Sequence, residues 1–137
     1  MWIFYAGLSA VFAALVAIFA KVGVQNINSN LAVAIRTIVI LMFTWGVVFA
    51  FGAHKQIPHI SAKNWIFLTL SALATALSWL CYYRALQLGD VSRVAPLSKL
   101  SIIITIAIAA AFLGETLTLK VVIGALLILA GTLLIAM

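Results

Sequence analysis

The chain has 137 residues, of which 67% are hydrophobic and only 7% are charged. A water-soluble domain carries roughly a quarter charged residues, so this composition excludes a soluble globular protein with a polar surface. The formal net charge of +6 does not indicate nucleic-acid binding, because the basic residues stand singly near the ends of apolar segments and form no patch.

The chain consists of long apolar segments separated by short polar loops. A helix rises about 1.5 Å per residue, so roughly 20 apolar residues cross a hydrocarbon core about 30 Å thick. Every segment is long enough, and no polar stretch is long enough to fold by itself. The sequence therefore predicts an all-α membrane protein with a single domain over residues 1–137. Its five transmembrane helices are expected at about residues 2–20, 31–51, 65–83, 94–113 and 117–136.

The first segment is expected to be a retained transmembrane helix rather than a signal peptide. It lacks a basic n-region, and its apolar run exceeds the usual h-region. Ala6, Ala10, Ala14 and Ala17 follow one another at helical spacing along one face. Small residues in this pattern let helices approach closely in lipid, so the pattern predicts a packed bundle.

The second segment contains a cation, Arg36, about five residues inside its start. An intramembrane charge is costly and is a functional hypothesis by default. About five residues correspond to about 7 Å, however, which a long side chain can cross by snorkelling to the interface. Snorkelling is the first interpretation of Arg36, and an intramembrane charge that faces a cavity is the second.

The third segment carries a row of polar residues. Ser71, Thr75, Ser78 and Tyr82 follow spacings of four, three and four, so they share one helix face, with Trp79 beside them. This pattern predicts the polar wall of a substrate cavity, in which the aromatic rings stack on cargo. The alternative is that the hydroxyls bond neighbouring helices or the backbone of their own helix.

The fourth segment begins with Pro96, which falls in the first turn, where a missing backbone N–H costs little. We expect Pro96 to act as a hinge. Lys99 lies about five residues inside, in a turn made polar by Ser98 and Ser101, and is expected to pair with the charge of the cargo or to snorkel. If Lys99 and Arg36 both face inward, the cavity is cationic and suits anionic or zwitterionic cargo.

Several functions lack the residues that they need. The only two acids, Asp90 and Glu115, lie at helix ends, which argues against proton-coupled export of cationic drugs through a buried carboxylate. The single cysteine, Cys81, excludes an intrachain disulfide. His54 and His59 are expected to be solvated loop residues rather than metal ligands. We therefore expect no enzyme activity, no metal and no cofactor.

An odd number of spans places the two termini on opposite sides of the membrane. Loop cations normally fix the orientation, but here three stand against three once Arg36 and Lys99 are set aside. The side of the amino terminus has Lys55, Lys63 and Lys120, and the other side has Lys21, Arg84 and Arg93. The balance is either chance in a small count or a sign of dual topology, in which copies insert both ways and pair antiparallel.

The second half of the chain resembles an EamA-type domain of the drug/metabolite transporter superfamily. The resemblance is carried by the Ala-Leu-x-x-Gly turn at 85–89, the proline at the start of the next helix, and Leu-Gly-Glu at 113–115. Full-length members resemble two such five-helix units fused as inverted repeats around a cavity. For a single unit, the resemblance implies an antiparallel homodimer that stands in for the fused protein. The chain is also similar in size to small multidrug resistance proteins, but it has a fifth helix and no acid in its first.

These observations together predict a secondary transporter, acting as an exporter of a small polar metabolite or drug. It would work as an antiparallel homodimer by alternating access in the inner membrane of a prokaryote. Its partners would be the substrate, the lipid bilayer and a second copy, with no nucleic acid. Two alternatives stay open: a non-transporting membrane subunit that needs a partner chain, and a flippase of a lipid-linked substrate.

Overall fold

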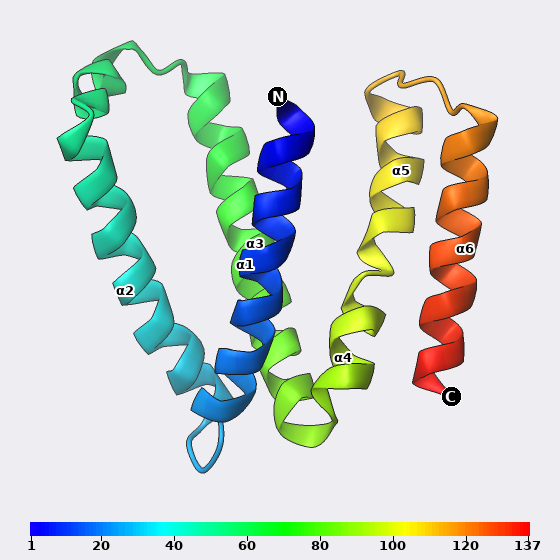
Figure 1. Cartoon of the computed structure of the whole chain (residues 1–137). Helices are drawn as coiled ribbons and strands as arrows, with labels where there is room; N and C mark the ends of the chain where they lie inside the picture. The colour runs from blue at the N-terminus through cyan, green and yellow to red at the C-terminus, as the bar shows by residue number, and fades with distance from the viewer. The chain divides into compact units, whose positions relative to one another are not determined.

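The structure is a computed structural model that describes all 137 residues, and every regular element in it is helical. Figure 1 follows the chain from α1 in blue to α6 in red. A short 3-10 helix, η1 (Ala53–His59), lies between the second and third long helices. The α-helices are α1 (Trp2–Gly23), α2 (Ser29–Ala50), α3 (Ala62–Leu88), α4 (Val91–Ser98), α5 (Ser101–Phe112) and α6 (Leu119–Ala136).

The predicted all-α fold with five spans is confirmed. Five helical segments are long and apolar enough to cross a membrane, with α4 and α5 together forming the fourth, Val91–Phe112. The largest difference in length concerns α3, which was predicted at 65–83 and runs from Ala62 to Leu88. Hydropathy marks only the apolar part of a helix, and α3 continues through the polar residues Arg84 and Gln87.

Two polar caps set the starts of α2 and α6. The side chain of Asn28 accepts hydrogen bonds from the amides of Asn30 at 2.8 Å and Leu31 at 3.4 Å, so α2 begins at Ser29 rather than at residue 31. The hydroxyl of Thr118 accepts from the amide of Val121 at 3.4 Å and starts α6. Both helices thus begin where a side chain satisfies a free backbone donor.

The fourth span is interrupted between α4 and α5, a feature that hydropathy does not reveal. The hydroxyl of Ser98 donates to the carbonyl of Ala95 at 2.7 Å. That carbonyl would otherwise accept from the amide of Lys99, which instead bonds the carbonyl of Pro96 at 2.8 Å. The amide of Leu100 likewise bonds three residues back. The helix therefore tightens into 3-10 turns at this point, because a side chain competes with the helical ladder.

The chain divides into two compact units, Phe19–Gln87 and Met1–Ile18 with Leu88–Met137. In the first unit, Leu86, Val24 and Tyr83 are buried, and η1 packs against α2 after a left-handed turn at Gly52 (φ 67°). In the second unit, α4 packs against α6, and α5 contacts α6.

Most large apolar side chains point outward. None of the residues in the apolar windows of α3 and of the fourth span is buried inside the structure. The buried apolar side chains are few, and several are small. Such a surface is stable only where lipid or other protein covers it, as expected for a membrane protein.

Candidate functional site

The predicted hydroxyl row lies on an open face of α3. Ser71, Thr75 and Ser78 are exposed, and Tyr82 is half-buried. The hydroxyl of Thr75 donates to the carbonyl of Ser71 at 2.8 Å, so this hydroxyl is engaged by its own helix. The row is thus free of helix packing within its unit, although one of its donors is already used.

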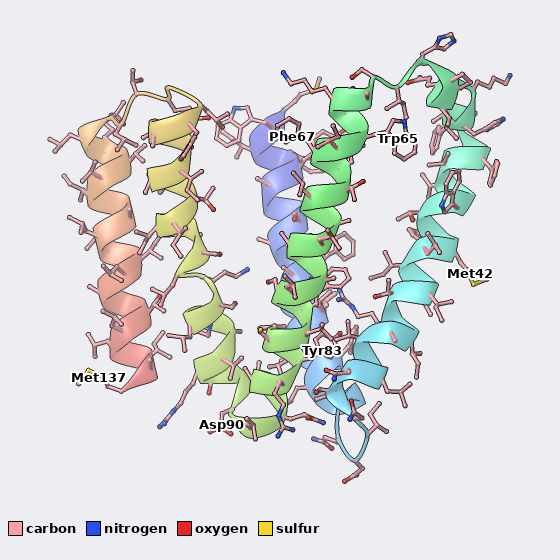
Figure 2. The ribbon with its side chains drawn as sticks, turned by 180° about the vertical axis from the view of Figure 1, so that it is seen from behind. Met42, Trp65, Phe67, Tyr83, Asp90 and Met137 are labelled. Carbon is pink, nitrogen blue, oxygen red and sulfur yellow. The ribbon has the colours of Figure 1, made fainter.

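A cation–aromatic cluster joins α2 to α3. The guanidinium carbon of Arg36 lies 4.1 Å from the centroid of the Trp79 ring and 5.6 Å from that of Tyr83. Both distances fall within the range of about 6 Å in which a ring attracts a cation. Tyr83 is only 4% exposed, and it lies in the half of α3 that ends near Asp90 (Figure 2). The structure therefore places Arg36 against aromatic faces of the neighbouring helix.

The cluster lies well inside the spans. Arg36 comes about seven residues after the start of α2 at Ser29, which corresponds to about 10 Å along the helix. Trp79 comes about five residues, or about 7 Å, before Arg84, where the polar end of α3 begins. Both residues therefore lie about 7–10 Å inside the polar ends of their helices, short of the middle of a hydrocarbon core about 30 Å thick. The charge of Arg36 is therefore held against the two rings, inside the ends of both helices.

No acid is present to balance this charge. The sequences of α2 and α3 contain neither Asp nor Glu, and the side chain of Arg36 makes no hydrogen bond or ion pair in the structure. A guanidinium that makes no hydrogen bond to the protein keeps its N–H donors, whose fork fits a carboxylate or a phosphate. Chemically, the cluster can bind an oxyanion.

A second feature lies in the other unit, at the interruption of the fourth span. Lys99 is exposed there and directly follows the last residue of α4, while Pro96, half-buried, lies one turn earlier. Secondary transporters commonly form substrate and ion sites where a transmembrane helix is interrupted. The predicted hinge and the predicted charge partner are thus brought together at one break.

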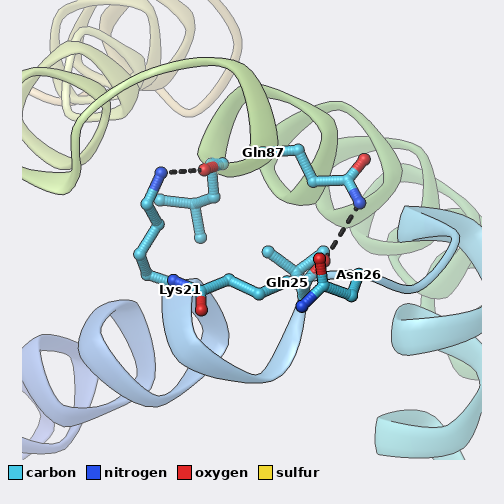
Figure 3. Close-up of a pocket in the computed structure, with 6 residues that line it drawn as sticks. Lys21, Gln25, Asn26 and Gln87 are labelled. Carbon is cyan, nitrogen blue, oxygen red and sulfur yellow. Dashed lines mark hydrogen bonds between the residues drawn. The ribbon is translucent and has the colours of Figure 1, made fainter.

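A cavity of about 290 Å³ lies where α1 ends and α3 approaches its own end (Figure 3). The Nζ atom of Lys21 donates to the carbonyl of Leu86 at 2.6 Å. The amide nitrogen of Gln87 donates to the carbonyls of Val24 at 3.1 Å and Ile27 at 2.6 Å. These bonds satisfy carbonyl groups left over at helix ends, so the cavity is a polar junction that ties the two helices together.

Comparison with known proteins decides the family. The EamA-like transporter family matches the chain over residues 1–137. The chain belongs to the EamA-like transporter family. The resemblance inferred from the sequence is therefore confirmed, and the protein is a membrane transporter of a family that is not an enzyme family.

Two curated relatives of this EamA-like chain are similar to it. A protein of Sinorhizobium sp named "Uncharacterized transporter in cobO 3'region" is 53% identical over 135 residues, which are 98% of this chain and 96% of the relative. An uncharacterized protein of Methanocaldococcus jannaschii is 37% identical over 83 residues, which are 61% of each protein. No solved structure matches the chain.

Family membership and five spans make the protein a multi-pass membrane transporter, with a substrate and the bilayer as its partners. The assignments of individual residues to the substrate path stay predictions. Sequence analysis missed two contributors to the polar features, Tyr83 and Gln87. Tyr83 was overlooked because it falls outside the hydroxyl row, and Gln87 because its partners lie on another helix.

Proposed function

We propose that this EamA-like unit is a secondary transporter that exports a small polar metabolite or drug as an antiparallel homodimer. The observation that carries the proposal is the count of five spans in one unit. Alternating access in transporters of this kind uses two repeats of opposite orientation around a central site. An odd number of spans cannot supply an inverted repeat within one unit, whereas a second copy inserted the other way does so.

Two further observations support the homodimer. The relative from Sinorhizobium is matched over 96% of its length, so that transporter is also about one five-span unit long. The loop cations of this chain are balanced, three against three, so neither orientation is favoured by charge. Insertion in both orientations would take place in the cytoplasmic membrane of a bacterium or archaeon.

The residues predicted from the sequence to bind the substrate keep their proposed roles, each within its own unit. The open face of α3 contributes Ser71, Thr75, Ser78 and Tyr82, with Trp79 and Arg36 beside it. The interruption after α4 contributes Lys99, and Pro96 is the hinge. Exposure of the hydroxyl row and the break in the fourth span support these roles, since a path needs polar groups that are not consumed by packing.

The test fixes the orientation of the protein in the membrane by adding lysines to the loops on one side. One variant, Gln56→Lys with Asn64→Lys, adds cations on the side of the amino terminus, and a matched variant, Asn30→Lys with Ser92→Lys, adds them on the other side. All four positions are exposed. Reporters fused to the carboxyl terminus give the orientation, and export of a panel of labelled metabolites from loaded cells gives the activity.

The unaltered protein is expected to give reporter signal on both sides of the membrane. Each fixed variant alone should be inactive, and the two expressed together should restore transport. A single orientation of the unaltered protein, or full transport by one fixed variant alone, would overturn the antiparallel homodimer. A fixed orientation together with activity only beside another chain would favour a subunit that needs a partner. Transport only of cargo with a lipid tail would favour a flippase.

A further inference from the structure

We infer that the Arg36–Trp79–Tyr83 cluster is the site that recognises the cargo, and that the cargo is a small organic carboxylate without an ammonium group. This inference rests on the proposed transport function, since it names the class of molecule that the path accepts. It makes the guanidinium of Arg36 the binding group and the rings its support.

The geometry leaves the donors of Arg36 available. The guanidinium carbon lies over the Trp79 ring, 4.1 Å from its centroid, and no protein acceptor engages the N–H groups of Arg36. An arginine fixed in this way is preorganised, because the stacked ring restricts its rotamers. A carboxylate can then accept two parallel hydrogen bonds from the fork.

Charge selects the type of anion. The site holds one positive charge about 10 Å along α2 from Ser29, with no acid on α2 or α3. A monoanion makes the loaded site neutral, whereas a phosphate dianion would leave an unpaired negative charge in the membrane, which is costly. An ammonium group would find no carboxylate on either helix. A carboxylate without an ammonium group is therefore the best match.

Depth favours a free molecule over a lipid headgroup. The start of α2 marks the polar boundary, and Arg36 lies about 10 Å beyond it. A headgroup phosphate stays at that boundary, while a small acid can enter. The half-buried rings of Trp79 and Tyr82 offer aromatic surface for the apolar part of such an acid, while the buried ring of Tyr83 supports them, its centroid 6.3 Å from that of Tyr82.

The test measures binding in the purified full-length protein by the fluorescence of Trp79. Replacing the exposed Trp2, Trp45 and Trp65 by Phe leaves Trp79 as the only indole. Three probes share one ring: benzoate, the neutral benzamide, and phenylalanine, which adds an ammonium group. We expect a saturable response to benzoate, with at least about tenfold weaker binding of the other two.

Two arginine variants and one control make the test specific. Arg36→Gln should abolish the benzoate response, and Arg36→Lys should weaken it at least about tenfold, because an ammonium cannot form the bidentate pair. Arg93→Gln removes an exposed arginine of α4 and should leave the response unchanged. Equal binding of benzoate and benzamide by the parent protein would overturn the inference even if the Arg36 variants failed to fold.

Measurements in lipid discs distinguish a free carboxylate from a lipid headgroup as the anion that binds. In phosphatidylcholine discs, added phosphatidylglycerol should leave the Kd for benzoate unchanged within about twofold. Loss of benzoate binding when phosphatidylglycerol is added would assign the cluster to a lipid headgroup and overturn the inference. Because this measurement requires neither transport nor a second copy, binding without transport would contradict only the proposed function. Transport without benzoate binding would contradict only this inference.

Discussion

Gln87 is expected to hold the ends of α1 and α3 together. Its amide nitrogen donates to the carbonyls of Val24 at 3.1 Å and Ile27 at 2.6 Å, which belong to the chain just beyond α1. Gln87→Leu keeps a side chain of similar size and removes both bonds, together with the exposed hydrogen bond that Arg84 Nη1 donates to Gln87 Oε1 at 3.0 Å within α3. The substitution therefore tests how much this junction contributes to the free energy of unfolding.

The magnitude follows from the two bonds and their surroundings. Each intramolecular hydrogen bond contributes about 0.5–1.5 kcal/mol net, so two bonds give about 1–3 kcal/mol. The cavity beside Gln87 is large enough for water to reach the freed carbonyls, which reduces the loss. We therefore expect Gln87→Leu to lower the free energy of unfolding by about 1–2 kcal/mol.

The assay is unfolding in mixed micelles, followed by circular dichroism as the fraction of denaturing detergent rises. Gln25→Leu is the matched control, because Gln25 lines the same cavity and its side chain makes no hydrogen bond. This control should change stability by less than about 0.5 kcal/mol. If Gln87→Leu and Gln25→Leu unfold at the same detergent fraction, the hydrogen bonds of Gln87 do not stabilise the junction.

Three further predictions concern the second compact unit. Thr118→Ala removes the cap of α6 and should lower the free energy of unfolding by about 0.5–1 kcal/mol in the same assay. This loss is at the low end for a cap because the hydrogen bond is 3.4 Å long, and an unchanged unfolding midpoint would contradict a capping role. Gly114→Ala should lower the free energy of unfolding by about 1 kcal/mol, because Gly114 has a left-handed backbone (φ 68°) that alanine adopts at a cost. No atom lies within 4 Å of the added carbon, so a much larger loss would indicate a steric clash. Ser98→Ala should free the carbonyl of Ala95 to accept from the amide of Lys99 and so slow hydrogen exchange at that amide. Unchanged exchange would show that the hydroxyl of Ser98 does not cause the interruption between α4 and α5.

The spans could be predicted from sequence because in a membrane both length and polarity are set by the bilayer. Because the prediction rests on apolar length, it misses polar extensions of helices and breaks within apolar segments. Polar residues that extend a helix past the apolar run, such as Arg84 and Gln87, carry no hydropathy signal. The break at Lys99 depends on the rotamer of Ser98, which no spacing rule encodes.

In the candidate site, too, features within one helix could be predicted from the sequence and contacts between helices could not. The hydroxyl row was predictable, since Ser71, Thr75 and Ser78 lie on one helix and the helical repeat alone relates them. The cluster around Arg36 was not, because it depends on which face of α3 meets α2. Sequence analysis favoured snorkelling for Arg36, whereas the structure places its guanidinium over Trp79. A tertiary contact between helices therefore supplied what periodicity could not.

Because few side chains are buried, self-association of this protein depends on the lipid around it. Few large side chains, among them Leu86, Val24 and Tyr83, are buried, so most of the apolar area remains for lipid or for another chain. Lipid tails and protein side chains compete for that area on nearly equal terms. Association is then governed by the number of chains per lipid molecule rather than by concentration in buffer. Adding lipid at constant protein should separate copies, and diluting the vesicles should not.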